Sequence, residues 1–424
     1  MFNRIRWQRS ELLRNADFIK VWTAESISQF GAQISIIVVP LIAAITLDAT
    51  PLEMGILSAA GPAPRLAIGF FAGAWADRLP RRPIMIFTNL GRMIASAMIP
   101  IIALSGDLTF AILLAIAVIT GMQSVFFDTA WAALLPNMVD RKQLTDATSK
   151  LMGSASLAQV VGPALGGLIV GLLGGPQAMW IPAATFSISA MILMRIRTPE
   201  VVPDRSQSAT SMWREVREGL EELWREPVVL ALMNSSIVLN FGGAMFLAVY
   251  VLFMTNDLGL SSQGIGLVFA SGGVGALAGT IIAPLLAKKI GVGPSILVGA
   301  IGFGVANLPV PLAFYFPEIA LPVVVFGETG AWLSLMVFNV NRFALRQAMT
   351  PNHLRGRIAA SSITLVSGAA MIGSLLGGVI GELASVHAAL YVSIVFQTGA
   401  ALWVWRSPVP AIIDFPEDDP VPAK

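Results

Sequence analysis

Long apolar segments separated by short polar breaks recur along the whole chain. A helix that crosses the hydrocarbon core of a membrane needs about 20 mostly apolar residues, and these segments are long enough. The pattern therefore predicts an all-α polytopic membrane protein with twelve transmembrane helices. The predicted spans are 18–46, 51–76, 83–105, 108–136, 150–173 and 176–195 in the first half of the chain, and 228–256, 262–287, 292–315, 319–347, 358–384 and 387–406 in the second.

The longest polar stretch divides the apolar segments into two sets of six. Within it, apolar residues recur at helical spacing with Arg and Glu between them, which indicates an amphipathic helix. Such a helix lies either on the membrane surface or in solvent, as a plain linker. The expected domains are an amino-terminal half (1–196), the linker (197–227), a carboxy-terminal half (228–406) and a tail (407–424).

Positively charged residues lie on one side of this map. The chain has 27 Lys and Arg residues, and all of them fall in the terminal segments, in alternate loops or at the edges of these, except Arg65, Arg92 and Arg342, which lie inside spans. The loops on the opposite side contain none. Because cytoplasmic loops concentrate Lys and Arg, we expect both termini in the cytoplasm of a bacterial cell and the spans in its inner membrane.

Composition narrows the class of function. Only 12% of the residues are charged and 55% are hydrophobic, whereas a soluble globular protein carries about 25% charged residues. The sequence therefore excludes a soluble enzyme, and we expect no nucleic-acid partner. The absence of cysteine excludes disulfides and thiolate metal sites. The two histidines, His353 and His387, are far apart and have no ligand-spaced neighbours, so we expect neither a metal site nor a cofactor.

The two halves repeat a glycine-rich pattern. The fifth span reads Gly-Pro-Ala-Leu-Gly-Gly from Gly162, and the eleventh reads Gly-Ser-Leu-Leu-Gly-Gly from Gly373, 211 positions later. Small residues let helices pack closely in lipid, and Pro163 can kink its helix. We expect the fifth span to pack against the eighth, around residues 268–279, although an ordinary packing face is the alternative. Two pseudo-symmetric six-helix halves around a central substrate site are typical of transporters.

The loop between the second and third spans reads Gly-Ala-Trp-Ala-Asp-Arg-Leu-Pro-Arg-Arg from Gly73 to Arg82. Gly73 allows close helix approach, and Asp77 can accept hydrogen bonds from the exposed N–H groups at the start of another helix, with Arg357 near the candidate start. This spacing predicts a conformational latch, whereas the alternative is a positive loop that only fixes topology. The latch residues we expect are Gly73, Asp77, Arg78, Arg81, Arg82 and Asp128.

Ionisable residues inside apolar spans are costly, usually paired and often functional. Glu25 and Glu328 are candidates for proton coupling, because an apolar surrounding favours the protonated form of a carboxylic acid. Asp128 in span four is a further candidate, although structural pairing is its favoured role and Arg92 in span three is a possible partner. For Glu25 the alternative to a coupling role is a static pair with Arg65, and either arginine could also attract an anionic substrate.

The chain from about residue 11 to residue 406 resembles the major facilitator superfamily. The loop from Gly73 to Arg82 matches the superfamily pattern G-x-x-x-D-R-x-x-R-R, and the fifth span is similar to its antiporter signature, with Ala158 in place of the first glycine. The remaining signature residues are Gly162, Pro163, Gly166 and Gly167. The opening Leu13–Phe18 and the segment Leu354–Arg357 look closest to the branch that contains macrolide-efflux proteins and the enterobactin exporter.

This resemblance implies a monomeric exporter that works by alternating access. It implies that a small amphipathic molecule, drug-like or a siderophore, leaves the cell as protons flow in, and that Asp128 pairs with Arg81 of the loop. The expected partners are that substrate, protons and the lipid bilayer. Two other functions stay open: a lipid or lysophospholipid transporter without proton coupling, and the uptake of a metabolite.

Overall fold

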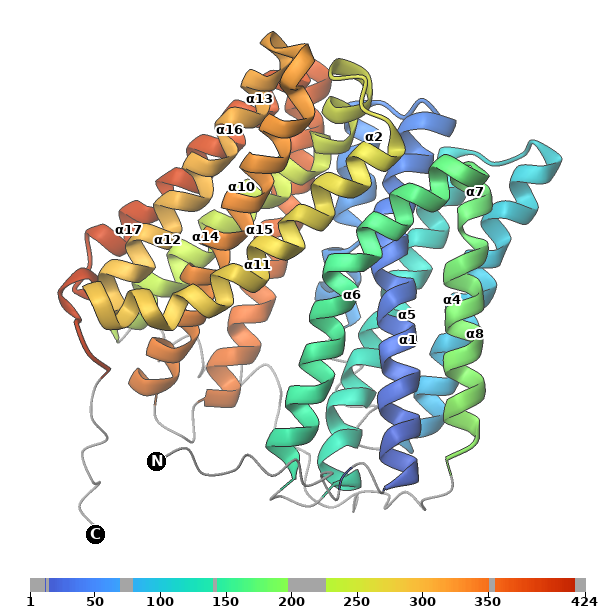
Figure 1. Ribbon diagram of the computed structural model, residues 1–424, viewed down its shortest axis with the longest axis horizontal. Coiled ribbons are helices and arrows are strands. Elements are labelled where there is room, and N and C mark those ends of the chain that lie inside the picture. Colours follow the sequence, from blue (N-terminus) through green and yellow to red (C-terminus); the bar gives the residue numbers. More distant parts are fainter. Residues whose placement is uncertain are drawn as a thin grey trace, which may run out of the picture. The chain divides into compact units, whose positions relative to one another are not determined.

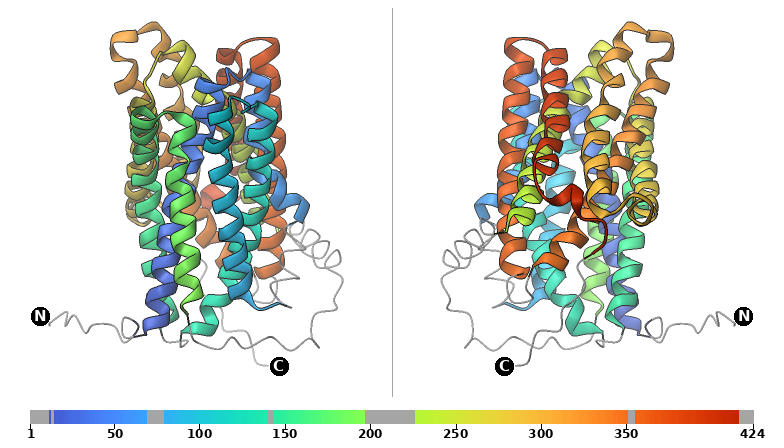
Figure 2. Two further views of the ribbon diagram at one scale, coloured as in Figure 1. Left: turned by 90° about the vertical axis from the view of Figure 1, so that its right-hand side faces the viewer. Right: turned by 90° about the vertical axis from the view of Figure 1, so that its left-hand side faces the viewer.

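The computed structural model describes residue 12 and residues 15–68, 79–139, 143–196, 226–350 and 355–415, and this part of the chain is built from helices with no strand (Figures 1 and 2). Eleven of the described helices are long and apolar enough to cross a membrane. The predicted second span starts as α2 (Pro51–Ala59) and is helical again at 62–68, but its last residues lie outside the described part. The predicted amphipathic helix also lies outside it, and of the linker (197–227) only residues 226 and 227 are described.

The described residues group into two compact units. The first contains those of Met1–Ile42 and Ala67–Ser208, and the second those of Ala43–Leu66 and Ala209–Lys424. The helices of the first unit are α1 (Ala16–Leu41), α4 (Arg81–Ser105), α5 (Phe110–Met138), α6 (Leu144–Leu173), α7 (Gly175–Ala178) and α8 (Trp180–Met194). Within it, α1 packs against both α6 and α8, and α4 packs against α5 and α8.

The second unit contains α2 and the helices that follow residue 226. These are α10 (Pro227–Leu252), α11 (Ser262–Ile290), α12 (Val292–Asn307), α13 (Pro309–Leu312), α14 (Ala320–Met349), α15 (Arg355–Leu383), α16 (Val386–Gly399) and α17 (Ala401–Trp405). Short 3₁₀ turns lie at Ala313–Tyr315, Pro317–Ile319 and Val409–Ala411. Here α14 packs between α11 and α12, while α10 packs against α15 and α16 (Figure 1).

The helix boundaries confirm the internal repeat. Ala16 and Pro227, the first residues of α1 and α10, are 211 positions apart, as are Leu144 and Arg355, the first residues of α6 and α15. Both α1 and α10 continue into a π-helical turn, Ile42–Thr46 and Phe253–Asp257 respectively. The offset found in the glycine-rich segments therefore extends to the helices themselves.

The caps of two helices repeat in the same way. The Thr50 side chain accepts a hydrogen bond from the backbone N–H of Glu53 at the start of α2, and Glu53 bonds back to the Thr50 N–H. Ser261, 211 positions later, accepts from the backbone N–H of Gly264 at the start of α11. Such side chains satisfy amide groups that the first turn of a helix leaves without a partner.

Large apolar side chains cover much of the protein's outer surface. Leu104, Phe326 and Leu383 are 75%, 76% and 82% exposed, and each lies on a membrane-length helix. A soluble protein rarely leaves contiguous apolar patches in water, whereas lipid solvates them. The exposure of these residues therefore agrees with a multi-pass membrane protein.

Candidate functional site

Arg92 on α4 is the central charge of the first unit. Its side chain is almost completely buried, and its Nη1 lies 3.5 Å from the hydroxyl oxygen of Ser28 on α1, to which it donates a hydrogen bond. The guanidinium carbon lies 4.4 Å from the ring centroid of Phe127 and 5.5 Å from that of Phe186. Two aromatic faces and a hydroxyl group therefore stabilise this cation inside a span.

Two acids share Arg92 as an electrostatic partner. Glu25 on α1 and Asp128 on α5 both interact electrostatically with its guanidinium group. Glu25 is buried, and its Oε1 accepts a hydrogen bond from Nε2 of Gln29 at 2.7 Å, whereas its Oε2 has no hydrogen-bond partner. The sequence predicted Arg92 as a possible partner of Asp128 and Arg65 as an alternative partner of Glu25. Both acids interact electrostatically with Arg92, whereas Arg65 is exposed and belongs to the second unit. The pairing of Asp128 with Arg81 stays a prediction.

A chain of buried hydrogen bonds supports this cluster. The Ser28 hydroxyl donates to Oδ1 of Asn89 at 3.3 Å, Nδ2 of Asn89 donates to the Ser189 hydroxyl at 2.9 Å, and that hydroxyl donates to the Ala24 carbonyl at 2.7 Å. These bonds join α1, α4 and α8 and hold Ser28 beside Arg92. Sequence analysis missed all three polar residues. The available signal was their spacing, since Ser28 and Asn89 lie one helical turn from Glu25 and Arg92.

Glu328 is the buried acid of the second unit. Its side chain on α14 is 4% exposed, and its Oε1 accepts a hydrogen bond from Nε1 of Trp332 at 2.8 Å. The Tyr250 hydroxyl on α10 interacts electrostatically with the same carboxyl group, although its geometry falls outside that of a hydrogen bond. Within the described part of the chain, no cation interacts with Glu328. This carboxyl group therefore depends on neutral partners alone.

Aromatic rings and one glycine shape the surroundings of Glu328. The ring of Tyr250 lies 4.8 Å from that of Phe246 and 5.8 Å from that of Phe269. Gly272 on α11 faces Trp332 and Glu328, and a Cβ atom at this position would lie 3.0 Å from the Glu328 Oε1. The absence of a side chain at position 272 is therefore what lets the acid and the indole approach α11.

The predicted latch is only partly visible. Gly73, Asp77 and Arg78 lie outside the described residues. Arg82 donates from Nε to the Leu193 carbonyl at 2.9 Å and from Nη2 to the Met194 carbonyl at 2.6 Å. Arg81 is buried at the start of α4. The latch role therefore stays a prediction, and the structure shows that Arg82 contacts the end of α8.

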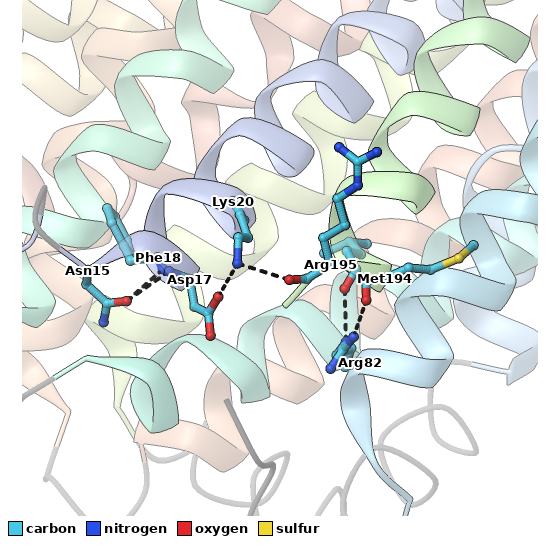
Figure 3. Close-up of polar contacts among 8 residues, drawn as sticks. Asn15, Asp17, Phe18, Lys20, Arg82, Met194 and Arg195 are labelled. Carbon is cyan, nitrogen blue, oxygen red and sulfur yellow. Dashed lines mark hydrogen bonds and ion pairs between the residues drawn. The ribbon is translucent and has the colours of Figure 1, made fainter. Parts of the chain in front are cut away.

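Cationic side chains stabilise the carboxyl end of α8 (Figure 3). Besides Arg82, Lys20 donates from Nζ to the Arg195 carbonyl at 3.0 Å and to the Asp17 carboxylate at 2.7 Å. The last carbonyl groups of a helix have no partner within that helix and carry partial negative charge. These contacts therefore fasten the ends of α1, α4 and α8 to one another.

The glycine motif of α6 packs against α1. A Cβ atom added to Gly162 would lie 2.5 Å from the Cβ of Gln33, and one added to Gly166 would lie 3.3 Å from the Ile34 carbonyl oxygen. The eighth span was predicted as the neighbour of these two glycines, and this prediction is wrong. A glycine-rich face indicates close packing without identifying the partner helix.

The repeated motif packs in the equivalent way in the second unit. Gly373 and Gly377 of α15 lie against Phe241 and Met245 of α10, the helix that corresponds to α1 in the repeat. The glycines of α11 instead approach α14, where a Cβ atom added to Gly279 would crowd the backbone of Leu333. Each half therefore uses its glycine motif to bring the fifth helix of the half close to the first.

Comparison with known proteins places this chain among transporters. The family model described as transmembrane secretion effector matches residues 11–420. A multidrug efflux pump, Tap, from Mycolicibacterium fortuitum is 27% identical over 350 residues, which cover 80% of this chain and 83% of the relative. The MFS-type transporter YfiS from Bacillus subtilis is 24% identical over 378 residues, which cover 87% of this chain and 88% of the relative.

Solved structures share the fold. A bacterial homologue of the iron transporter ferroportin in an inward-facing state matches with a TM-score of 0.74 at 18% identity. The match covers 93% of this chain and 98% of that homologue. The nucleoside transporter NupG has a TM-score of 0.72 at 11% identity and covers 92% of this chain and 98% of its own. The relatives and neighbours named here are membrane transporters rather than enzymes, and the resemblance predicted from the motifs is confirmed. The chain is therefore a multi-pass membrane transporter and belongs to the transmembrane secretion effector family of the major facilitator superfamily.

Proposed function

We propose that this protein exports a small amphipathic, drug-like molecule by alternating access and that inward proton flow drives the export. The observation that carries the proposal is a buried carboxyl group in each half, Glu25 and Glu328, on membrane-length helices. An acid inside a span is a functional candidate because the bilayer penalises its charged form. Relatives named as multidrug efflux pumps, at 25% and 27% identity, support the direction and the substrate class.

The two acids have different surroundings, and this suits them to different steps. Glu25 shares the charge of Arg92 with Asp128, so a proton on Glu25 changes the balance of a three-charge cluster. Glu328 has only neutral partners among the residues that the structure describes, so ionisation of its carboxyl group in this apolar surrounding is costly. In this proposal, Glu328 carries a proton between the two sides, while Arg92 keeps Glu25 and Asp128 in place.

The orientation of the protein follows from its charge distribution. Both termini lie in the cytoplasm of a bacterial cell and the spans cross its inner membrane, because Lys and Arg concentrate on that side. The protein acts as a monomer.

The loop from Gly73 to Arg82 acts as a latch on the cytoplasmic side, and Asp77→Asn is expected to slow transport strongly while membrane insertion stays normal. Transport at the wild-type rate by this variant, measured in proteoliposomes, would remove the latch from the proposal.

Transport in proteoliposomes tests the proposed function. The purified protein is reconstituted, a pH gradient is imposed, and the movement of a panel of fluorescent amphipathic dyes is followed. We expect at least one dye to move against the direction of proton flow, and collapse of the gradient with a protonophore should stop net transport. Dye movement at the same rate with and without the pH gradient would contradict proton coupling. Movement of dye and protons in the same direction would indicate uptake instead.

A further inference from the structure

Two arginines lie one helical turn apart on α14, and their partners among the described residues are neutral. Nη2 of Arg342 donates a hydrogen bond to Oδ1 of Asn339 at 3.2 Å, and Nη1 of Arg346 donates to the Ser362 hydroxyl of α15 at 2.9 Å. The Arg342 guanidinium carbon lies 5.5 Å from the ring centroid of Phe338. All of these groups belong to the second unit.

No acid compensates this pair. In the part of the chain that the structure describes, neither guanidinium forms an ion pair with a carboxylate or interacts electrostatically with one, and the buried Nε of Arg342 has no hydrogen-bond partner. Arg92 of the first unit, in contrast, has two acidic partners. Like charges spaced by four residues on a helix repel each other, and arginine inside a span is costly. An anion that binds to the pair would relieve both costs.

The site lies near one end of a membrane-length helix. The helix α14 ends at Met349, and at about 1.5 Å per residue Arg346 and Arg342 lie roughly 5 Å and 10 Å from that end. A hydrogen bond from Asn341 to the Ala283 carbonyl sets the register with α11, whose last turn carries Lys288 and Lys289. The positive charge extends across two helices.

The surroundings of the pair are apolar on one side. Phe343, whose ring centroid lies 5.4 Å from the Arg346 guanidinium carbon, is about half exposed on a membrane-length helix. An alkyl chain could therefore lie along this face while its polar group reaches the arginines. Arginine presents a planar fork of N–H donors that matches the two oxygens of a carboxylate or phosphate.

We propose that Arg342 and Arg346, positioned by Asn339 and Ser362, bind the oxyanion of an amphiphile, a phosphate or carboxylate group attached to an apolar chain. The two sources of this chemistry are an anionic membrane lipid and a transported molecule. The site does not depend on Glu25 or Glu328, so it stands or falls independently of the proposed proton coupling.

Binding of three amphiphiles with the same chain length tests the proposal. The wild-type protein in phosphatidylcholine nanodiscs is titrated with dodecyl phosphate, dodecanol and dodecyltrimethylammonium. We expect dodecyl phosphate to bind about tenfold more tightly than the other two, since a hydrogen bond to a charged group contributes this much or more. Equal affinity for the phosphate and for dodecanol would overturn the proposal.

Matched variants locate the site. Arg342→Gln should weaken binding of dodecyl phosphate about tenfold or more, and Arg342→Lys, which keeps the charge without the planar fork, should weaken it less. Arg406→Gln, which changes an exposed arginine at the end of α17, should leave binding unchanged. Equal affinities of wild type and Arg342→Gln, or equal losses in Arg342→Gln and Arg406→Gln, would contradict the site. Arg346→Lys provides a second test if Arg342→Gln does not fold.

Two further measurements distinguish the sources. If the anion is a membrane lipid, protein from nanodiscs that contain phosphatidylglycerol retains that lipid in native mass spectrometry, and Arg342→Gln loses it. If the anion belongs to a transported molecule, proteoliposomes with the wild-type protein move dodecyl phosphate, and those with Arg342→Gln do not. A variant that matches the wild type in both measurements would overturn the proposal.

Discussion

The indole Nε1 of Trp332 donates a hydrogen bond of 2.8 Å to Oε1 of Glu328, which lies one turn before it on α14. Because no cation of the described residues interacts with this carboxyl group, the indole is its closest stabilising partner. Small changes in the position of Trp332 should therefore alter how easily Glu328 gains or loses a proton.

Replacing Gly272 by alanine is expected to disturb this pair. The added Cβ atom would lie 2.6 Å from Cδ1 of Trp332 and 3.0 Å from Oε1 of Glu328, so the indole has to move. Overpacking of this kind costs about 1–3 kcal/mol. We expect proton-driven dye transport in proteoliposomes to slow by roughly tenfold, the effect of adding about 1.4 kcal/mol of this cost to the barrier of the coupled step.

Gly264→Ala is the matched control on the same helix. Its added Cβ atom would meet no heavy atom of another residue closer than 3.5 Å, which is ordinary van der Waals contact. Transport by this variant should equal that of the wild type. If Gly272→Ala transports as fast as Gly264→Ala, the geometry around Trp332 and Glu328 has no part in coupling.

Replacing Arg92 by glutamine is expected to destabilise the first unit. The change leaves Glu25 and Asp128 without the cation that they share. Removing a buried cation that interacts with two acids lowers stability, because their negative charges lose one compensating charge. The midpoint of thermal unfolding in detergent should therefore fall by several degrees or more.

A double variant identifies the cause of that loss. Adding Glu25→Gln to Arg92→Gln removes one of the uncompensated charges and should restore part of the lost stability, which a double-mutant cycle measures. If the double variant unfolds at a temperature no higher than Arg92→Gln alone, Glu25 and Arg92 do not stabilise each other.

The glycine motif of α6 yields a third prediction. In Gly162→Ala the added Cβ atom would lie 2.5 Å from the Cβ of Gln33, so α1 and α6 must separate. We expect a loss of about 1–3 kcal/mol in stability, measured as a lower unfolding temperature. Gly153→Ala, on the same helix with no heavy atom within 4 Å of the added Cβ atom, should have no such effect.

Leucine substitutions at Gly166 and Gly377 distinguish a role in helix packing from a role in blocking proton leak. A Cβ atom at Gly377 would lie 2.5 Å from the Met245 carbonyl oxygen, and one at Gly166 would lie 3.3 Å from that of Ile34, so Gly377→Leu should destabilise the protein more. If the α6 motif also seals the protein against protons, Gly166→Leu should nevertheless give the larger proton leak in proteoliposomes without substrate. An equal proton leak in both variants would indicate that both glycine motifs serve only in helix packing.

Periodicity and repeat analysis predicted much of the fold. The helices α4, α10 and α14 begin within two residues of their predicted starts. An apolar run just long enough to cross a membrane limits where its helix can begin. The offset of 211 positions, inferred from two glycine-rich segments, also describes the starts of α1 and α10. Helix starts and the repeat offset are positions along the chain, so they can be predicted from the sequence alone.

The contacts of the candidate site were harder to predict. Sequence position indicates how deep Glu25 lies in its span but not the direction in which it faces, so the sequence pointed to Arg65 and missed its interaction with Arg92. The hydrogen bonds from Ser28 to Asn89 and from Asn89 to Ser189 join three helices whose packing order no local pattern specifies. The uncompensated state of Arg342 likewise required knowledge of every neighbouring helix.

Substrate-induced proton movement is the most direct test of the central claim that Glu25 and Glu328 couple export to protons. Wild-type protein and the Glu25→Gln, Glu328→Gln and double variants are reconstituted with a pH-sensitive dye inside the vesicles, and a transported dye is then added. The account predicts that the wild type moves protons when substrate is added, that at least one single variant loses most of this signal, and that the double variant gives none. Proton movement at the wild-type level in the double variant would contradict the account and leave Asp128 as the next candidate.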